Sequence, residues 1–126
     1  MAMDVSPLVP AGRQVINGYG DGGFRITGQR FEGSVLVFPD RTLTIDLPSA
    51  AALTLDHLSE IFAATPAVEL VLFGTGAAIA PPQPAIRAAL RERRIGLELM
   101  DSGAACRTYN VLMAEDRRVA ALLVAV

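Results

Sequence analysis

Two short stretches of this sequence hold residue types suited to ligand binding or catalysis. Gly74-Thr75-Gly76 offers closely spaced backbone amides, which can cradle an anion when they precede a helix. The match to a dinucleotide-binding fingerprint is incomplete, because Ile79 stands where a third glycine is required. Asp101-Ser102 forms the second stretch, where Asp101 could act as a general base or cap a helix. We interpret the glycines as a tight strand exit and Asp101 as a cap.

The segment after Asp101-Ser102 carries the one cysteine of the chain, Cys106, beside Arg107. A neighbouring cation lowers the pKa of a thiol and makes it more reactive. Helical spacing nevertheless puts Cys106 on the same face as Tyr109, so we interpret it as a small core residue. Arg107, Thr108 and Asn110 remain candidates for a surface that binds a ligand or a partner.

The other chemically capable residues do not complete a catalytic set. The one histidine, His57, is predicted on the exposed side of a different helix, and nothing in the spacing brings it to Cys106. All basic residues are arginine, which excludes a Schiff-base or P-loop lysine. A single cysteine excludes an internal disulfide and a zinc site built on cysteine pairs. We expect no cofactor and no metal, and we favour a non-enzymatic role.

The bulk composition is typical of one globular domain. The chain has 126 residues, of which 52% are hydrophobic and 19% charged, and its net charge is −2. This balance argues against nucleic acid as a partner. The longest apolar run, 119–126, is far short of the roughly 20 residues that span a bilayer. The start of the sequence lacks a cationic region before an apolar stretch, so we expect no signal peptide and a cytoplasmic protein.

The hydrophobic period changes midway along the chain. Strands are predicted over 15–20, 24–27, 34–38 and 42–47, which form an N-terminal β-meander. After a cap at Thr54, helices are predicted up to 65 and over 84–94 and 103–114. They alternate with strands over 68–73, 97–100 and 117–126. The order is β-β-β-β-α-β-α-β-α-β, in which the last strand of the β-meander opens the β-α-β-α-β-α-β part, and it predicts an α/β domain with parallel later strands.

This organisation places the two chemically capable stretches together. Residues 13–126 are predicted to form one domain after a flexible arm over 1–12, which holds Pro7 and Pro10. Ligands of such sheets gather beyond the carboxyl ends of the strands. The segments 73–76 and 100–102 both follow strands, so a small-ligand cleft at this edge is the alternative to a binding-only role.

Apolar strands suggest how the chain could associate. Residues 119–126 are apolar on both faces, which suits a central strand, whereas an edge strand of this kind would pair with another chain. Phe24, Phe31, Val35 and Val37 could form an exposed apolar patch. Either surface would allow a homo-oligomer.

Several segments, taken in order, resemble one family. They are Ile16-Asn17-Gly18-Tyr19-Gly20 with Gly23-Phe24, Gly33 to Val37, Leu72 to Gly76, Ala104 to Leu112, and Arg118 to Ala121. Together they resemble the small Mth938-like domain family that includes the mitochondrial respiratory complex I assembly factor and the adipogenesis-associated domain protein. The resemblance covers about 15–126.

The resemblance implies a single three-layer α/β domain with a mixed, largely parallel central sheet. It implies an interaction role, since the mitochondrial member assists complex I assembly through protein contacts. The family offers no agreed catalytic residues; its motif positions here are Gly74, Gly76, Cys106, Arg107, Thr108 and Asn110. The absence of a presequence favours a bacterial cytoplasmic protein over a mitochondrial one.

Three functional hypotheses follow. The first is a non-enzymatic protein-interaction domain, assembly-factor-like, for a respiratory or membrane complex, with a protein partner and no membrane insertion. The second is a small-ligand binder or enzyme that uses the strand-end cleft near Gly74–Gly76 and Asp101–Ser102. The third is a thiol-reactive regulator that uses Cys106.

Overall fold

The computed structural model describes residues 12–126, which open with a small antiparallel sheet. Its strands, in the order β1-β2-β3, are β1 (Ile16–Gly20), β2 (Gly23–Ile26) and β3 (Gln29–Glu32). Tight turns join them at Asp21-Gly22 and Thr27-Gly28, where all four residues have positive φ. Two central residues of positive φ are what type I′ hairpins require. The predicted arm over 1–12 lies outside the described residues, apart from Gly12.

A second, five-stranded sheet forms the centre of the domain. Its strands are β4 (Ser34–Phe38), β5 (Arg41–Ile45), β6 (Leu70–Gly74), β7 (Gly96–Met100) and β8 (Val119–Leu123). They lie in the order β5-β4-β8-β6-β7. β4 is antiparallel to β5 and β8, whereas β6 is parallel to β7 and β8. The mixed sheet and the parallel pairing of the last three strands are thus confirmed. The predicted meander is divided between two sheets, and the chain changes sheet at Gly33, where φ is 79°.

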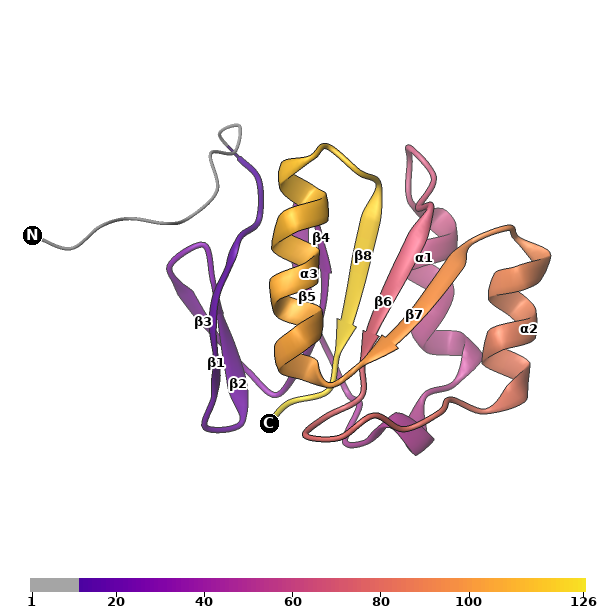
Figure 1. The fold of residues 1–126 in the computed structure, drawn as a ribbon, viewed down its shortest axis with the longest axis horizontal. Coiled ribbons are helices and arrows are strands. Elements are labelled where there is room, and N and C mark those ends of the chain that lie inside the picture. Colours follow the sequence, from indigo (N-terminus) through magenta and orange to yellow (C-terminus); the bar gives the residue numbers. More distant parts are fainter. Residues whose placement is uncertain (1–11) are drawn as a thin grey trace, which may run out of the picture.

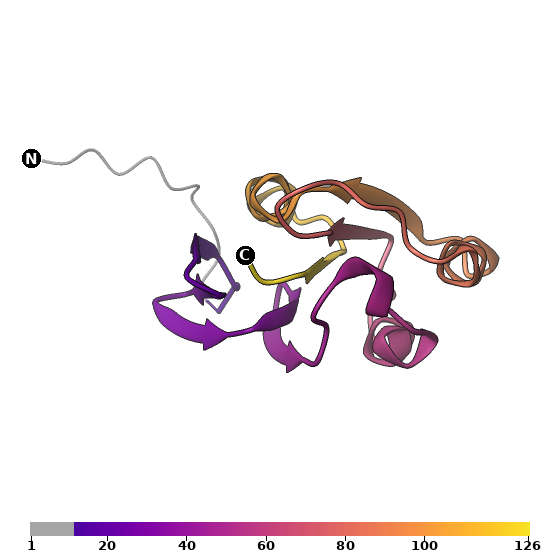
Figure 2. The same cartoon turned by 90° about the horizontal axis from the view of Figure 1, so that it is seen from below.

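Helices cover both faces of the central sheet. They are α1 (Ser59–Ala63), preceded by the 3-10 turns η1 (Ala50–Ala52) and η2 (Leu55–Leu58), then α2 (Pro84–Glu92) and α3 (Ser102–Ala114). Figure 1 shows α3 in front of the central sheet with the small sheet beside it. Figure 2, turned by 90°, shows α1 on the face away from α3 and α2 beyond β7. The predicted three-layer arrangement is therefore present.

The first predicted helix is shorter and less regular than expected. It consists of the 3-10 turn η2 followed by the short helix α1. The ring of His57 fixes the start of this segment through two hydrogen bonds. Its Nδ1 lies 2.9 Å from the Thr54 backbone nitrogen, and its Nε2 lies 2.9 Å from the Asp46 carbonyl oxygen. His57 is half-buried, so its predicted place on the exposed side of a helix was wrong.

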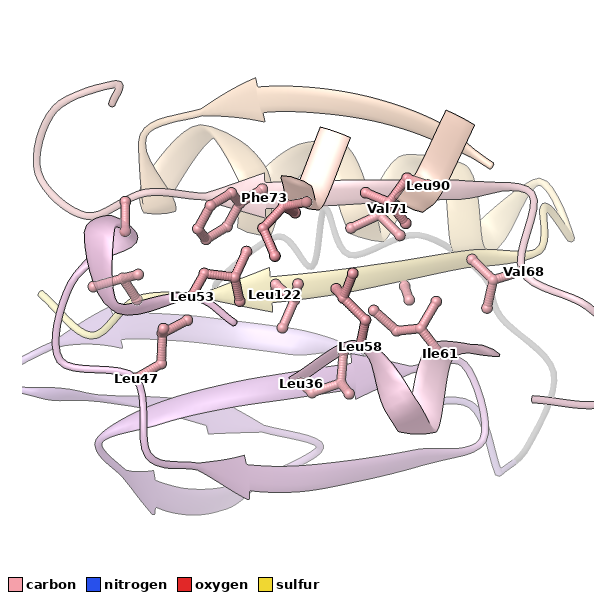
Figure 3. Packing of buried hydrophobic residues seen from close by; sticks show 14 of the residues in the cluster. Leu36, Leu47, Leu53, Leu58, Ile61, Val68, Val71, Phe73, Leu90 and Leu122 are labelled. Carbon is pink, nitrogen blue, oxygen red and sulfur yellow. The ribbon is translucent and has the colours of Figure 1, made fainter. Parts of the chain in front are cut away.

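The central sheet is apolar on both faces because both faces are covered. Side chains alternate along β8: Val119, Ala121 and Leu123 pack toward α3 and the small sheet, and Ala120 and Leu122 toward the opposite layer. Figure 3 shows the second of these cores, where side chains from β4, β6 and β8 meet those of the η2–α1 segment.

The predicted exposed patch on the N-terminal strands was wrong. Phe24, Val35 and Val37 are buried, and Phe31 is half-buried, because the small sheet packs over the central sheet on the α3 side. β8 is a central strand, so its apolar faces are covered within the chain itself.

Candidate functional site

The strand-end edge forms where the sequence predicts it. The carboxyl ends of β6 and β7 meet the start of α3, and the Thr75 N–H donates a 2.9 Å hydrogen bond to the Met100 carbonyl oxygen. A Cβ at Gly74 would lie 2.9 Å from the Cα of Ser102 and 3.1 Å from the Cβ of Ala105. Gly74 is therefore the residue that lets β6 approach α3 closely.

Polar groups at this edge are hydrogen-bonded to one another. The buried Ser102 hydroxyl accepts from the Gly76 N–H at 3.0 Å and donates to the Val124 carbonyl at 2.7 Å. The buried Thr75 hydroxyl donates to the Ala78 carbonyl at 2.7 Å. The amides of Thr75 and Gly76 thus have acceptors within the protein, and an anion would have to displace those acceptors. A small-ligand cleft at this edge stays a prediction.

Asp101 occupies the N-cap position of α3. Its carboxylate accepts a 2.9 Å hydrogen bond from the Ala104 N–H. A carboxylate at this position satisfies a free amide and interacts favourably with the helix dipole. The geometry therefore gives Asp101 the capping role that the sequence favours.

Cys106 lies in the core between α3 and the central sheet. Its side chain packs in one cluster with Tyr109 and Met113, and the residue is 3% exposed. Burial raises the pKa of the Cys106 thiol to about 12, and the opposing effect of Arg107 is smaller. A thiol of this pKa stays protonated at neutral pH and is a poor nucleophile.

Asn110 and Tyr109 attach the N-terminal strand to α3. The Asn110 side chain accepts a hydrogen bond from the Ile16 N–H at 2.9 Å and donates one to the Ile16 carbonyl at 2.8 Å. The Tyr109 hydroxyl donates to the Gln14 carbonyl at 2.9 Å. These contacts give the Cys106–Asn110 motif a structural task, which is to hold β1 against the helix.

One candidate of the motif is presented to solvent. Arg107 is exposed, and its Nη1 donates a 3.3 Å hydrogen bond to the Tyr19 hydroxyl. Tyr19 lies across the first turn of α3, because a Cβ at Gly103 would approach its hydroxyl to 2.5 Å. Val111, one helical turn after Arg107, is 55% exposed. We call Tyr19, Arg107 and Val111 the α3 patch. Thr108 is half-buried beside it.

The structure also contains a cleft that the sequence analysis missed, at the opposite end of the central sheet. It has a volume of about 280 Å³. Four arginines from three distant parts of the sequence line it, namely Arg13, Arg41, and the adjacent Arg117 and Arg118. The antiparallel pairing of β4 with β8 creates this cleft, since it brings the β4–β5 turn beside the residues that precede β8.

Two further features bear on function. Over residues 12–126, no three His, Cys, Asp or Glu side chains are grouped as a metal site would require. None of the helices in this range combines the length and hydropathy needed to cross a membrane.

The fold is a small mixed α/β domain with a five-stranded central sheet. A separate three-stranded sheet is attached to α3, one of the helices that pack on this central sheet. Residues 16–124 match the family described as "Protein of unknown function (DUF498/DUF598)", and the chain belongs to this family.

Similar proteins of known sequence fall in two groups. The chain is 31% identical over 109 residues to NADH dehydrogenase (ubiquinone) 1 alpha subcomplex assembly factor 3 of Xenopus tropicalis, which covers 86% of this chain and 60% of that protein. It is 35% identical over 113 residues to an uncharacterised protein of Rhodobacter capsulatus, which covers 90% of this chain and 86% of that protein. The chain thus spans only about 60% of the length of the assembly factor. The predicted family resemblance is confirmed.

Solved structures agree with the fold. A protein of Bartonella henselae described as an outer membrane protein is 39% identical, with a TM-score of 0.84 over 90% of this chain and 96% of that one. A Mth938-like domain of Bordetella pertussis is 26% identical, with a TM-score of 0.80 over 98% of this chain and 92% of that one. The α/β fold with its mixed sheet is therefore shared with Mth938-like domains.

Proposed function

We propose that this protein is a non-enzymatic interaction domain that assists the assembly of a respiratory complex from the cytoplasmic side. The observation that carries the proposal is the 31% identity, over 109 residues, to a complex I assembly factor. Its partner is a protein subunit or a second assembly protein of that complex. The chain spans only about 60% of the length of that assembly factor, and the proposal concerns the part that the two proteins share.

The α3 patch supports the proposal and is the surface we would test first. Tyr19 and Arg107 are residue types that dominate binding energy at protein interfaces. Val111 adds an exposed apolar side chain on the same face of the helix. Asn110 lies beside them but holds Ile16, so changing it would disturb the fold as well as the surface.

Affinity capture from source cells, with mass spectrometry of retained proteins, tests this proposal. We expect subunits or assembly proteins of the respiratory NADH dehydrogenase to be retained by the wild-type chain. Arg107→Glu should reduce their recovery, because it reverses the one charge of the α3 patch. Arg91→Glu on the exposed face of α2 is the matched control, and it should leave recovery unchanged.

A deletion strain gives an independent readout. Loss of the protein should lower the amount of assembled NADH dehydrogenase on a native gel, and cell fractionation should place the protein in the cytoplasm. Unchanged assembly in the deletion strain, together with no respiratory protein in the capture, would contradict the proposal. The strand-end edge would then be screened for metabolites that raise the melting temperature.

A further inference from the structure

The cleft at the amino end of the parallel strands combines the enclosure, apolar lining and polar rim that are typical of a ligand site. The turn between β4 and β5, the loop after α1 and the start of β8 enclose it. Its accessible apolar lining comes from Pro39 and Ala64, which are half-buried, and from Pro66, which is exposed. Its rim is polar. Small-molecule sites usually combine a mostly apolar wall with a few placed polar groups.

Among the residues that line the cleft, basic side chains outnumber acidic ones. Four arginines and two aspartates, Asp40 and Asp116, line it, although the whole chain carries a net charge of −2. Arg13 pairs with Asp116, and Arg118 pairs with Glu69 outside the cleft. Arg41 lies between two carboxylates, 3.4 Å from Asp40 and 3.6 Å from Glu60.

Arg117 is the exception among these arginines. It lines the cleft and is exposed, and within residues 12–126 it forms no ion pair. Within the part of the chain that the structure describes, Arg117 is thus the arginine of this cleft that is left without a carboxylate partner. A carboxylate on a ligand would supply that partner.

A neighbouring cation is held in a fixed position. The Arg41 guanidinium lies over the Phe38 ring, with its carbon 4.1 Å from the ring centroid. This stacking and the two nearby carboxylates restrict Arg41. The ligand would therefore meet a fixed guanidinium on one wall, the free Arg117 on another and apolar side chains beneath.

We propose that this cleft binds a carboxylate attached to a small apolar group. Its carboxylate pairs with Arg117, and its apolar part lies on Pro39, Ala64 and Pro66. A doubly charged phosphate ester fits less well, because Asp40 and Asp116 would repel the second charge. The volume of about 280 Å³ suits a short branched or aromatic acid. A free acid and the C-terminal carboxylate of a peptide share this chemistry. The inference does not depend on the proposed role in assembly.

Titration of the ¹⁵N-labelled protein, followed by NMR, tests the site. The probes are isovalerate, phenylacetate, the peptide acetyl-Gly-Gly-Val with a free C-terminus, and inorganic phosphate. We expect saturable shifts of the amides of Arg117, Arg118 and Val119 with a carboxylate probe. Tighter binding of the free acids identifies a small molecule as the source, and tighter binding of the peptide identifies a protein C-terminus.

Two variants separate charge from shape. Arg117→Gln should weaken binding about tenfold, because it removes a charge-assisted hydrogen bond. Arg87→Gln, an exposed arginine on α2 outside the cleft, is the matched control and should bind as the wild type does. Ala64→Leu should also weaken binding, because it fills part of the cleft without changing charge.

Three results would overturn the proposal. The first is the absence of saturable shifts with every carboxylate probe. The second is equal binding by the wild type and Arg117→Gln when both give native spectra. The third is binding of inorganic phosphate as tightly as the carboxylates, since that would contradict the preference for a single negative charge.

Discussion

Asn110 binds both backbone groups of Ile16, so one side chain on α3 pairs with β1 as a neighbouring strand would. The two residues are 94 positions apart in sequence. Ile16 belongs to β1 of the small sheet, and Asn110 belongs to α3, which packs on the central sheet. Attachment of the small sheet therefore depends on a paired amide contact as well as on apolar packing.

Removal of this amide should destabilise the domain. Asn110→Ala leaves the Ile16 N–H and carbonyl without their partners, and we expect a loss of about 1–3 kcal/mol in the free energy of unfolding. Urea denaturation of the wild type and of Asn110→Ala measures this difference in the free energy of unfolding. Asn17→Ala is not a fair comparison, because the Asn17 side chain accepts a hydrogen bond from the Gly28 N–H. Arg107→Ala, one turn earlier and exposed, is the better control and should cost far less. Equal stability of Asn110→Ala and the wild type would show that the contact contributes nothing.

Gly74 should not tolerate a side chain. Gly74→Ala places a Cβ 2.9 Å from the backbone Cα of Ser102, so β6 and α3 must separate, at a cost of about 1–3 kcal/mol. Gly18→Ala in β1 is matched in chemistry, and its Cβ would have no atom within 4 Å. Thermal unfolding of the two variants should therefore give a lower melting temperature for Gly74→Ala alone. Similar melting temperatures would contradict the close approach at Gly74.

Ser102 should matter through its hydroxyl. Ser102→Ala leaves the Gly76 N–H and the Val124 carbonyl unpaired in a fully buried place, and we expect a loss of about 1–3 kcal/mol. Ser59→Ala, at an exposed position in α1, is the control and should change stability little. Hydrogen exchange of the Gly76 amide gives a local readout. It should accelerate in Ser102→Ala, and unchanged exchange would argue against the contact.

The Cys106 thiol should be unreactive while the protein is folded. The residue is 3% exposed, and its thiol is protonated at neutral pH. A chromogenic disulfide reagent should label it slowly in buffer and fully in denaturant. Fast labelling of the folded protein would revive the hypothesis of a thiol-reactive regulator.

Stability should fall at alkaline pH. Burial raises the pKa of Cys106 from its ordinary value of 9.0 to about 12, and burial also raises the pKa of the Tyr109 hydroxyl. The folded state thus holds these protons more tightly than the unfolded state does. The stabilisation is fully present below pH 9 and is lost as pH rises toward 12. Urea denaturation across this range should show a smaller alkaline loss for Cys106→Ala than for the wild type. A parallel pH dependence of the two proteins would contradict this assignment.

The sequence was informative where one local pattern determines the structure. The unbroken apolar run over 119–126 fits a strand covered on both faces, and β8 is such a strand. Asp101 was correctly interpreted as a cap because the cap contact is made three residues away, at Ala104. Strand β3 was missed because Gln29–Glu32 contains charged residues and little apolar alternation; its pairing depends on the turn at Thr27-Gly28 and on β2.

The sites depended on contacts that no local pattern contains. The motif around Cys106 and Asn110 was identified, but its contact with Ile16 requires the small sheet to pack over the central one. The arginine-lined cleft draws on positions 13, 41, 117 and 118, which meet only after β4 pairs with β8. A pattern of types and spacings therefore indicates which residues are capable of chemistry, whereas the topology decides which of them share a surface.

The position of β8 has a consequence for how the protein is made. β8 lies between β4 and β6, yet it follows both in the chain, so a ribosome completes every other strand first. Without β8, the central sheet would be two separate pairs, β5-β4 and β6-β7, each with an unprotected apolar edge. A nascent chain stalled before Val119 would therefore be a substrate for chaperones and prone to aggregation, and the central sheet would be completed only once β8 has left the exit tunnel.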